Sequence, residues 1–198
     1  MTRNVAILIF DEVEVLDFCG PFEVFGVTGL RAGGERPFHV YTVAEQARSV
    51  HARNGLSVNP NYTIAECPPP NILLVPGGQG TRTLIHNESL VKWVRNQAGR
   101  VDLLLSVCTG ALVLAQAGLL EGLAATTHFR AFDELKALAP NTTLCPNERY
   151  VDNGKIILSA GISAGIDMSL YVVARLLDAE QANETARYMQ YDYWPREQ

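Results

Sequence analysis

The stretch Leu103-Leu-Leu-Ser-Val-Cys-Thr-Gly-Ala-Leu-Val-Leu114 places one cysteine between two apolar runs. Ser106, Cys108 and Gly110 follow the spacing small–any–nucleophile–any–glycine, which is typical of a nucleophile elbow, a sharp turn from a strand into a helix. The pattern predicts that Cys108 is a reactive thiol at a helix N-terminus, where free N–H groups and the helix dipole favour the thiolate. The alternative is an inert buried cysteine.

Apolar runs and turn signals predict strands and helices that alternate along the chain. Gly20-Pro21 has the form of a helix start, which leaves Asp17 in the loop after the first strand. We expect strands over 5–10, 38–44, 72–75, 102–106, 124–128, 149–152 and 155–159, helices over 90–97, 110–117, 131–138, 164–177 and 179–190, a small antiparallel excursion within 50–64 and a turn over 31–37. This alternation predicts an α/β protein with a mainly parallel sheet between helices, folded as a single domain over 1–198.

Composition limits the partners of the chain. The 198 residues are 47% hydrophobic with a formal net charge of −5 and no basic run, which argues against a nucleic-acid groove. The uncharged stretch 103–120 is long enough to cross a membrane, but its polar and glycine residues favour a strand and a buried helix, and we expect no membrane partner. The N-terminus has the pattern of a strand rather than a secretion signal, so we expect a cytoplasmic protein.

The four cysteines, Cys19, Cys67, Cys108 and Cys145, are far apart in sequence. None lies within four residues of another, so no zinc-type ligand pair is predicted, and a disulfide framework is not expected without a secretion signal. We therefore expect no metal site.

Three candidate groups fall at the carboxyl ends of predicted strands, where open parallel sheets collect ligands. They are Asp17, the Gly77-Gly78 pair and Cys108. Asp17 is either a helix-capping carboxylate or an acid/base group, and beside a thiolate it would have to be protonated. The two glycines form either a tight turn only or a donor pair whose N–H groups stabilise a developing negative charge. Cys19, two residues beyond Asp17, is a candidate for lining the same pocket.

Two further residues are interpreted as structural. Nothing in the sequence places His128 beside Cys108, and the interpretation of His128 as a structural histidine is favoured over a Cys–His pair. Asp167, within an apolar helix, is interpreted as a capped or paired acid.

The chain resembles the ThiJ/PfpI family of the class I glutamine amidotransferase-like superfamily. The motifs that carry the resemblance span nearly the whole chain in order: Val15–Val24, Val75-Pro-Gly-Gly78, Ser106–Ala111, Ala125–His128 and Gly161–Asp167. The resemblance implies a flavodoxin-like three-layer sandwich and a homodimer.

Within that family the motifs look most like those of the isocyanide hydratases. The resemblance implies a cysteine-dependent hydro-lyase with Cys108 as nucleophile, Asp17 as acid/base and Thr109 beside them, needing no cofactor and acting on a small electrophilic carbon. Thr109 stands where peptidase-like and glyoxalase-like branches typically carry a histidine, which argues against protease activity. Cys19 occupies a position that varies in this motif.

Two alternatives remain. One is glyoxal-type carbonyl chemistry with the same thiol, and the other is a non-catalytic ligand or redox sensor. The motifs also occur in the N-terminal domains of AraC-type regulators. We expect no direct DNA contact, because the sequence ends at Gln198 without room for a helix-turn-helix pair.

Overall fold

The computed structural model describes residues 2–30 and 36–192, so most of the predicted 31–37 turn lies outside the described residues. A seven-stranded sheet runs through the molecule in the order β10-β11-β7-β6-β1-β2-β5. All neighbours pair in parallel except β10 and β11, which form the predicted hairpin. The strands are β1 (Arg3–Leu8), β2 (Phe38–Ala44), β5 (Tyr62–Thr63), β6 (Ile72–Val75), β7 (Leu103–Val107), β10 (Tyr150–Asp152) and β11 (Ile156–Ser159).

Five of the six parallel strands, β2-β1-β6-β7-β11, have the 2-1-3-4-5 order of the flavodoxin-like fold, and the short β5 extends the sheet beside β2. The predicted fold class is therefore confirmed. In this order the chain reverses direction across the sheet between β1 and β6, and a crevice opens there at the carboxyl ends of the strands. The segments that follow β1, β6 and β7 carry Asp17, the Gly77-Gly78 pair and Cys108.

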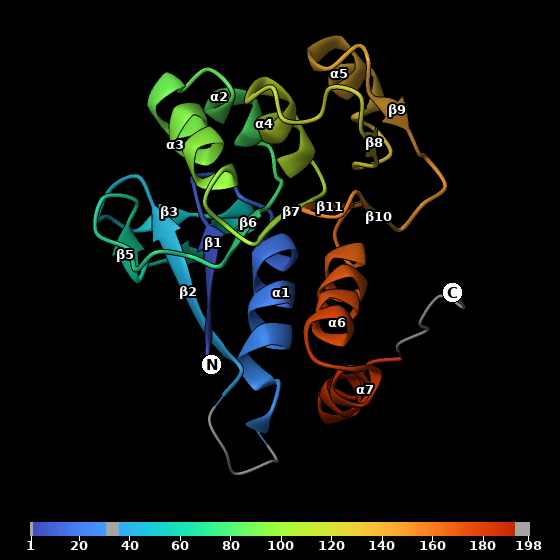
Figure 1. Ribbon diagram of the computed structural model, residues 1–198. Helices are drawn as coiled ribbons and strands as arrows, with labels where there is room; N and C mark the ends of the chain where they lie inside the picture. The colour runs from blue at the N-terminus through green and yellow to red at the C-terminus, as the bar shows by residue number, and fades with distance from the viewer. Residues whose placement is uncertain (1, 31–35, 193–198) are drawn as a thin grey trace.

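Helices cover both faces of the sheet (Figure 1). One layer consists of α2 (Thr81–Leu84), α3 (Glu88–Ala98), α4 (Gly110–Gln116) and α5 (Phe132–Leu138). The other consists of α1 (Val15–Val27), α6 (Ala164–Leu176) and α7 (Ala179–Tyr188). The sheet between them is thus the middle layer of a three-layer sandwich.

Successive side chains of each strand point to opposite faces of the sheet, so one hydrophobic core forms on each face. In β1, Val5 and Ile7 pack on the side of α1 and α6, whereas Ala6 and Leu8 pack on the side of α3 and α4. All four are fully buried, which explains the continuous apolar runs of the central strands.

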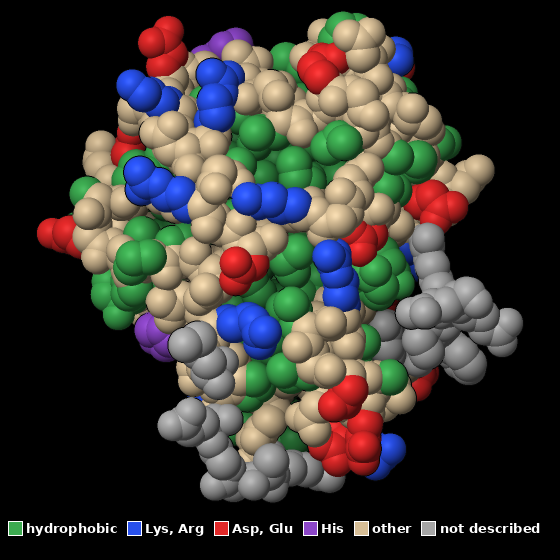
Figure 2. Space-filling view, viewed as in Figure 1, with side chains coloured by type: hydrophobic (Ala, Val, Ile, Leu, Met, Phe, Trp, Pro, Cys, Tyr) green, Lys and Arg blue, Asp and Glu red, His purple; other side chains and the backbone are tan. Residues whose placement is uncertain are grey.

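Two small two-stranded sheets lie outside the main sheet. The predicted excursion after β2 is an antiparallel pair, β3 (Val50–His51) and β4 (Ser57–Val58), joined by a 3₁₀ turn that contains Asn54-Gly55. The short pair β8 (Ala124–Ala125) and β9 (Thr143–Leu144) is parallel. On the face in Figure 2, basic and acidic side chains are interspersed. Within the described part of the chain, no helix has the length and apolar character needed to cross a membrane.

The expected start of the first helix is wrong. Helix α1 begins at Val15, so Asp17 lies in its first turn rather than in a loop, and Pro21 lies inside the helix. Gly20 serves a different purpose from a helix start. A Cβ at Gly20 would come within 2.9 Å of Ile166 Cγ1, so this glycine lets α1 and α6 approach each other closely.

Candidate functional site

The predicted elbow is present between β7 and α4. Cys108 follows the last residue of β7 and has φ of 57°, a left-handed conformation that a non-glycine residue rarely adopts. Its N–H lies 3.2 Å from the carbonyl oxygens of both Ser159 and Ala160, and Thr127 Oγ1 donates to its carbonyl oxygen at 2.8 Å. Such strain costs about 1–3 kcal/mol and persists because these bonds hold the turn on both sides.

Asp17 lies beside this thiol, in the first turn of α1. Its side chain is completely buried, and Oδ2 accepts a hydrogen bond from the Gly77 N–H at 3.0 Å. The backbone N–H of Ile162 also acts on this carboxyl as a donor. The other oxygen, Oδ1, accepts no protein hydrogen bond of standard geometry. An unpartnered buried oxygen favours a protonated carboxyl.

The thiol and the carboxyl each change the pKa of the other. Burial raises the pKa of Asp17 from 3.8 to about 7, against the lowering effect of the Gly77 N–H and the Cys108 thiol. Burial and the Asp17 charge raise the pKa of Cys108 from 9.0 to about 12. The expectation that the helix N-terminus favours a thiolate is therefore wrong, because these two effects outweigh the hydrogen bond from the Thr109 N–H. The raised pKa of Asp17 lies in the direction of a protonated carboxyl, and its role as an acid/base group stays a prediction.

Thr109 ties the elbow to the glycine-rich loop. Its Oγ1 accepts from the Gly78 N–H at 2.9 Å, and lies 3.1 Å from the Gly78 carbonyl oxygen and 3.2 Å from Thr81 Oγ1. The N–H of Gly77 is used by Asp17. Both N–H groups predicted to face a developing charge thus bond within the protein. Their role in this structure is to position Asp17 and Thr109.

A Thr109→Val variant tests this tie. Valine has nearly the same shape but leaves the buried Gly78 N–H without its acceptor, so we expect a loss of about 1–3 kcal/mol in the free energy of unfolding. Urea denaturation followed by far-UV circular dichroism measures it. Thr109→Ser keeps the hydroxyl and should recover most of the loss. Equal losses in the two variants would contradict a role for the hydroxyl.

Other predicted residues lie differently. Residues two apart on a helix do not face each other, so Cys19 points away from the Asp17 carboxyl, and its place in the pocket stays a prediction. Cys19 and Cys108, like the other two cysteines, are free. Asp167 accepts from Arg149 Nε at 2.6 Å and from Tyr191 at 3.0 Å, which fits the interpretation of a paired structural acid.

His128 makes no hydrogen bond or ion pair with Cys108 among the contacts of the described residues. Its ring packs on Gly161, where an added Cβ would lie 2.5 Å from Cδ2. Burial and the nearby Arg130 and Arg82 lower its pKa. A neutral imidazole beside the elbow is consistent with a structural histidine.

The sequence interpretation missed Ile162. This β-branched residue has φ of 58°, which is a genuine outlier for its type, and its N–H faces Asp17. No residue pattern signals such a conformation, because it depends on contacts made by the loop between β11 and α6. Among the described residues, no group of three or more His, Cys, Asp or Glu side chains is arranged to hold a metal ion.

Residues 3–175 match the sequence profile of the DJ-1/PfpI family. The chain belongs to this family. The match covers the β1, β6 and β7 loops that form the site, and the predicted resemblance is confirmed.

Several known proteins resemble the chain. An isonitrile hydratase from Pseudomonas putida is 32% identical over 191 residues, which is 96% of this chain and 79% of that protein. The transcriptional regulator GbdR of Pseudomonas aeruginosa is 25% identical over 173 residues, 87% of this chain, but the chain spans only 46% of its length. A crystal structure of a ThiJ/PfpI family protein from Pseudomonas syringae matches with a TM-score of 0.87 at 29% identity, covering 100% of this chain and 78% of that one.

Proposed function

We propose that the protein hydrates isocyanides to N-substituted formamides through a covalent thioimidate on Cys108. The observation that carries the proposal is the pairing of Cys108 with a fully buried Asp17 whose pKa lies near 7. The similarity to an isonitrile hydratase along 96% of the chain supports the choice of substrate. Such a pair can move one proton between sulfur, carboxyl and substrate carbon.

The addition step uses both groups. The proton of the Cys108 thiol passes to Asp17, and the sulfur forms a bond to the terminal isocyanide carbon. Asp17 then delivers the proton to that same carbon, which gives an S-linked thioimidate, R–N=CH–S. The Thr109 N–H at the start of α4 stabilises negative charge near the sulfur.

Water completes the turnover. Its oxygen adds to the thioimidate carbon while Asp17 takes one proton from it and passes that proton to the nitrogen, and the remaining hydroxyl proton goes to the sulfur in the last step. The C–S bond then breaks, which releases the formamide R–NH–CHO and returns the thiol. The sum is one isocyanide and one water converted to one formamide, with no oxidant or reductant.

Turnover is the direct test. Purified protein incubated with p-nitrophenyl isocyanide should produce the corresponding formamide, detected by chromatography. A protein that leaves the isocyanide unchanged while its thiol reacts readily with peroxide would contradict the proposal and favour the sensor. The likeness to GbdR gives that alternative its support. Consumption of glyoxal without isocyanide turnover would favour carbonyl chemistry.

The rate should depend on pH through the shared proton. The form that reacts carries one proton on the pair, as a thiol beside an ionised carboxylate that takes this proton when the sulfur attacks. Because the pKa of Asp17 is raised to about 7, both groups are protonated below that pH. We therefore expect kcat/KM for p-nitrophenyl isocyanide to rise between pH 6 and 8 with a midpoint near 7. A profile that falls over this range would contradict the assignment.

We also propose that the protein is a cytoplasmic homodimer. The proposal of a dimer rests on the family resemblance. Helix α1 exposes two large apolar side chains, Leu16 at 38% and Phe22 at 37%, but they lie on different sides of the helix and do not by themselves mark an interface. Size-exclusion chromatography with light scattering measures the mass in solution, and a mass of 21.7 kDa would contradict the dimer.

A further inference from the structure

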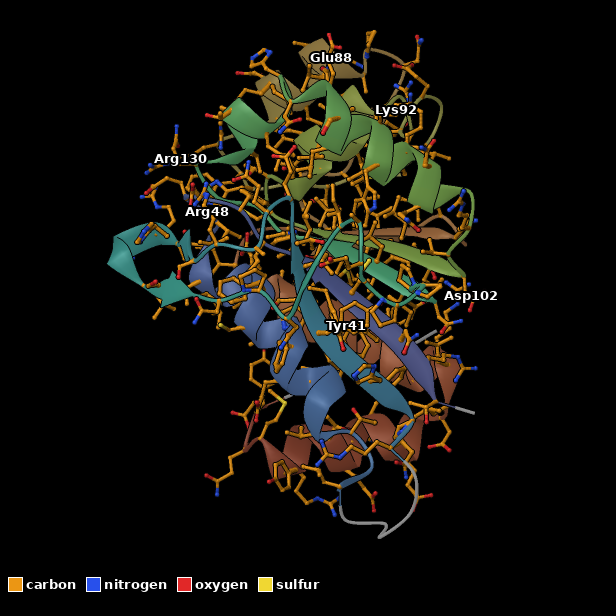
Figure 3. The ribbon with its side chains drawn as sticks, turned by 90° about the vertical axis from the view of Figure 1, so that its left-hand side faces the viewer. Tyr41, Arg48, Glu88, Lys92, Asp102 and Arg130 are labelled. Atoms are coloured by element: carbon orange, nitrogen blue, oxygen red, sulfur yellow. The ribbon has the colours of Figure 1, made fainter. Side chains whose placement is uncertain are left out.

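The segment His128-Phe129-Arg130 lies beside the elbow, and we call the surface around the Cys108 sulfur the mouth of the thiol pocket. The residue before the segment, Thr127, donates to the Cys108 carbonyl, and the His128 ring packs on Gly161, whose neighbour Ile162 faces Asp17. In Figure 3, Arg130 lies at the same end of the sheet as Arg48, which follows β2, and opposite Asp102, which precedes β7. The segment thus borders the carboxyl edge of the sheet, next to both reacting groups.

The reacting groups themselves leave little room. Cys108 is 5% exposed and Asp17 is not exposed at all, so the sulfur is open only to a small, slender reactive group, such as an isocyano group or the CH₂ of a haloacetyl reagent. An isocyano group has that shape, and the organic substituent that carries it must remain at the mouth. Whatever side chains stand at the mouth will contact that substituent.

Those side chains are apolar, flat and cationic. Phe129 is 72% exposed and Ile162 is 37% exposed, both high for large apolar residues. The His128 ring lies 4.5 Å from the Phe129 ring, centroid to centroid, and the Arg130 guanidinium lies over the same ring at 5.2 Å. A stack of this kind offers faces for an aromatic group and a guanidinium fork for a carboxylate.

The positive charge at the mouth also favours a substituent that carries a carboxylate. Arg82 is neutralised by a bidentate pair with Glu134, at 2.6 and 3.0 Å. In the part of the chain that the structure describes, Arg130 has no carboxylate partner. Glu14, a half-buried residue just before α1, raises the pKa of His128, whereas Arg130 lowers it. The exposed cation therefore lies on the side of the mouth formed by the 128–130 segment.

We propose that His128, Phe129, Arg130 and Ile162 form a subsite for the organic substituent of the substrate, and that this subsite prefers a flat group bearing a carboxylate. The statement about substrate rests on the proposed hydration of isocyanides. The subsite itself is a property of the thiol pocket and is testable without that reaction.

Alkylation of Cys108 tests the subsite without turnover. Iodoacetate and iodoacetamide differ in charge but have nearly the same size, and peptide mass spectrometry separates Cys108 from the other cysteines. We expect Arg130→Gln to lower the ratio of the iodoacetate rate to the iodoacetamide rate about three- to fivefold, and the effect to vanish in 1 M salt. Arg48→Gln is the matched control, because Arg48 pairs with Asp11 and lines a separate cavity of about 270 Å³ at the same sheet edge.

Substrate preference tests the assignment of the ligand. The ratio of kcat/KM for 4-isocyanobenzoate to that for phenyl isocyanide should fall about three- to fivefold in Arg130→Gln and stay unchanged in Arg48→Gln. In Phe129→Ala, kcat/KM for phenyl isocyanide should fall relative to that for methyl isocyanide. If both arginine variants give the same alkylation ratio, or neither reagent reaches Cys108, the subsite is refuted. If the alkylation ratio shifts but no isocyanide is turned over, the subsite stands and the proposed hydration fails.

Discussion

The Asp17→Asn variant is expected to lose isocyanide turnover by about 10²- to 10⁴-fold, the usual contribution of a positioned general acid. Asparagine fits the same space. Its oxygen keeps the hydrogen bond from Gly77, and its NH₂ group takes the place of Oδ1, which has no protein acceptor or donor of standard geometry. What the amide lacks is a proton to deliver to the substrate carbon. Steady-state kcat/KM with p-nitrophenyl isocyanide measures the loss.

The same variant should be more stable than the wild type at pH 8. A carboxyl whose folded-state pKa is raised contributes stability that is present below the unfolded value of 3.8 and is lost as pH rises through about 7. At pH 8 the wild type therefore carries a buried ionised group, and removal of that charge should gain about 2–4 kcal/mol in the free energy of unfolding. At pH 4 the two proteins should be nearly equal in stability.

Asp11→Asn is the matched control, with the opposite sign. Asp11 is an exposed carboxyl, and its hydrogen bonds from Arg48 and His51 lower its pKa. Its contribution to stability is present above pH 3.8 and is lost as pH falls. Asp11→Asn should therefore be slightly less stable than the wild type at pH 8, with turnover intact. Retained activity in Asp17→Asn, or a loss of stability at pH 8, would contradict the role of Asp17.

The sequence predicted the parts of the site that depend on strand ends. Strands β6 and β7 are short apolar runs bounded by glycine and polar residues, so Gly77, Gly78 and Cys108 could be placed at one edge of the sheet. Parallel topology then brings such loops together whatever their separation along the chain. This part of the prediction needed only periodicity and order.

The sequence did not predict the features that depend on contacts between elements. Pro21 misled the prediction of the first helix, since its position within α1 depends on packing against α6 rather than on local propensity. The left-handed Ile162 likewise depends on the loop between β11 and α6. The raised pKa of Cys108 follows from how deeply the elbow is buried beside Asp17, which no motif specifies.

A Gly110→Ala substitution should destabilise the fold more than any change to a single hydrogen bond of the site. Gly110 begins α4 directly against the end of β6. An added Cβ would lie 2.1 Å from the carbonyl oxygen of Val75 and 3.0 Å from that of Pro76. Both contacts are with backbone atoms that cannot turn aside, so either α4 or the end of β6 must move. We expect a loss of about 3 kcal/mol, which lowers Tm by about 6–12 °C in a chain of this size.

Gly26→Ala separates this steric clash from helix propensity. Gly26 lies within α1, and a Cβ there meets nothing within 4 Å, so alanine should raise stability by up to about 1 kcal/mol. Thermal denaturation of both variants gives the comparison, and the alkylation rate of Cys108 reports whether the elbow has moved. Because Gly110 is two residues from the nucleophile, the rate should change in Gly110→Ala and not in Gly26→Ala. Equal Tm values in the two variants would show that the elbow tolerates a side chain, and the small residue at this position would then need another explanation.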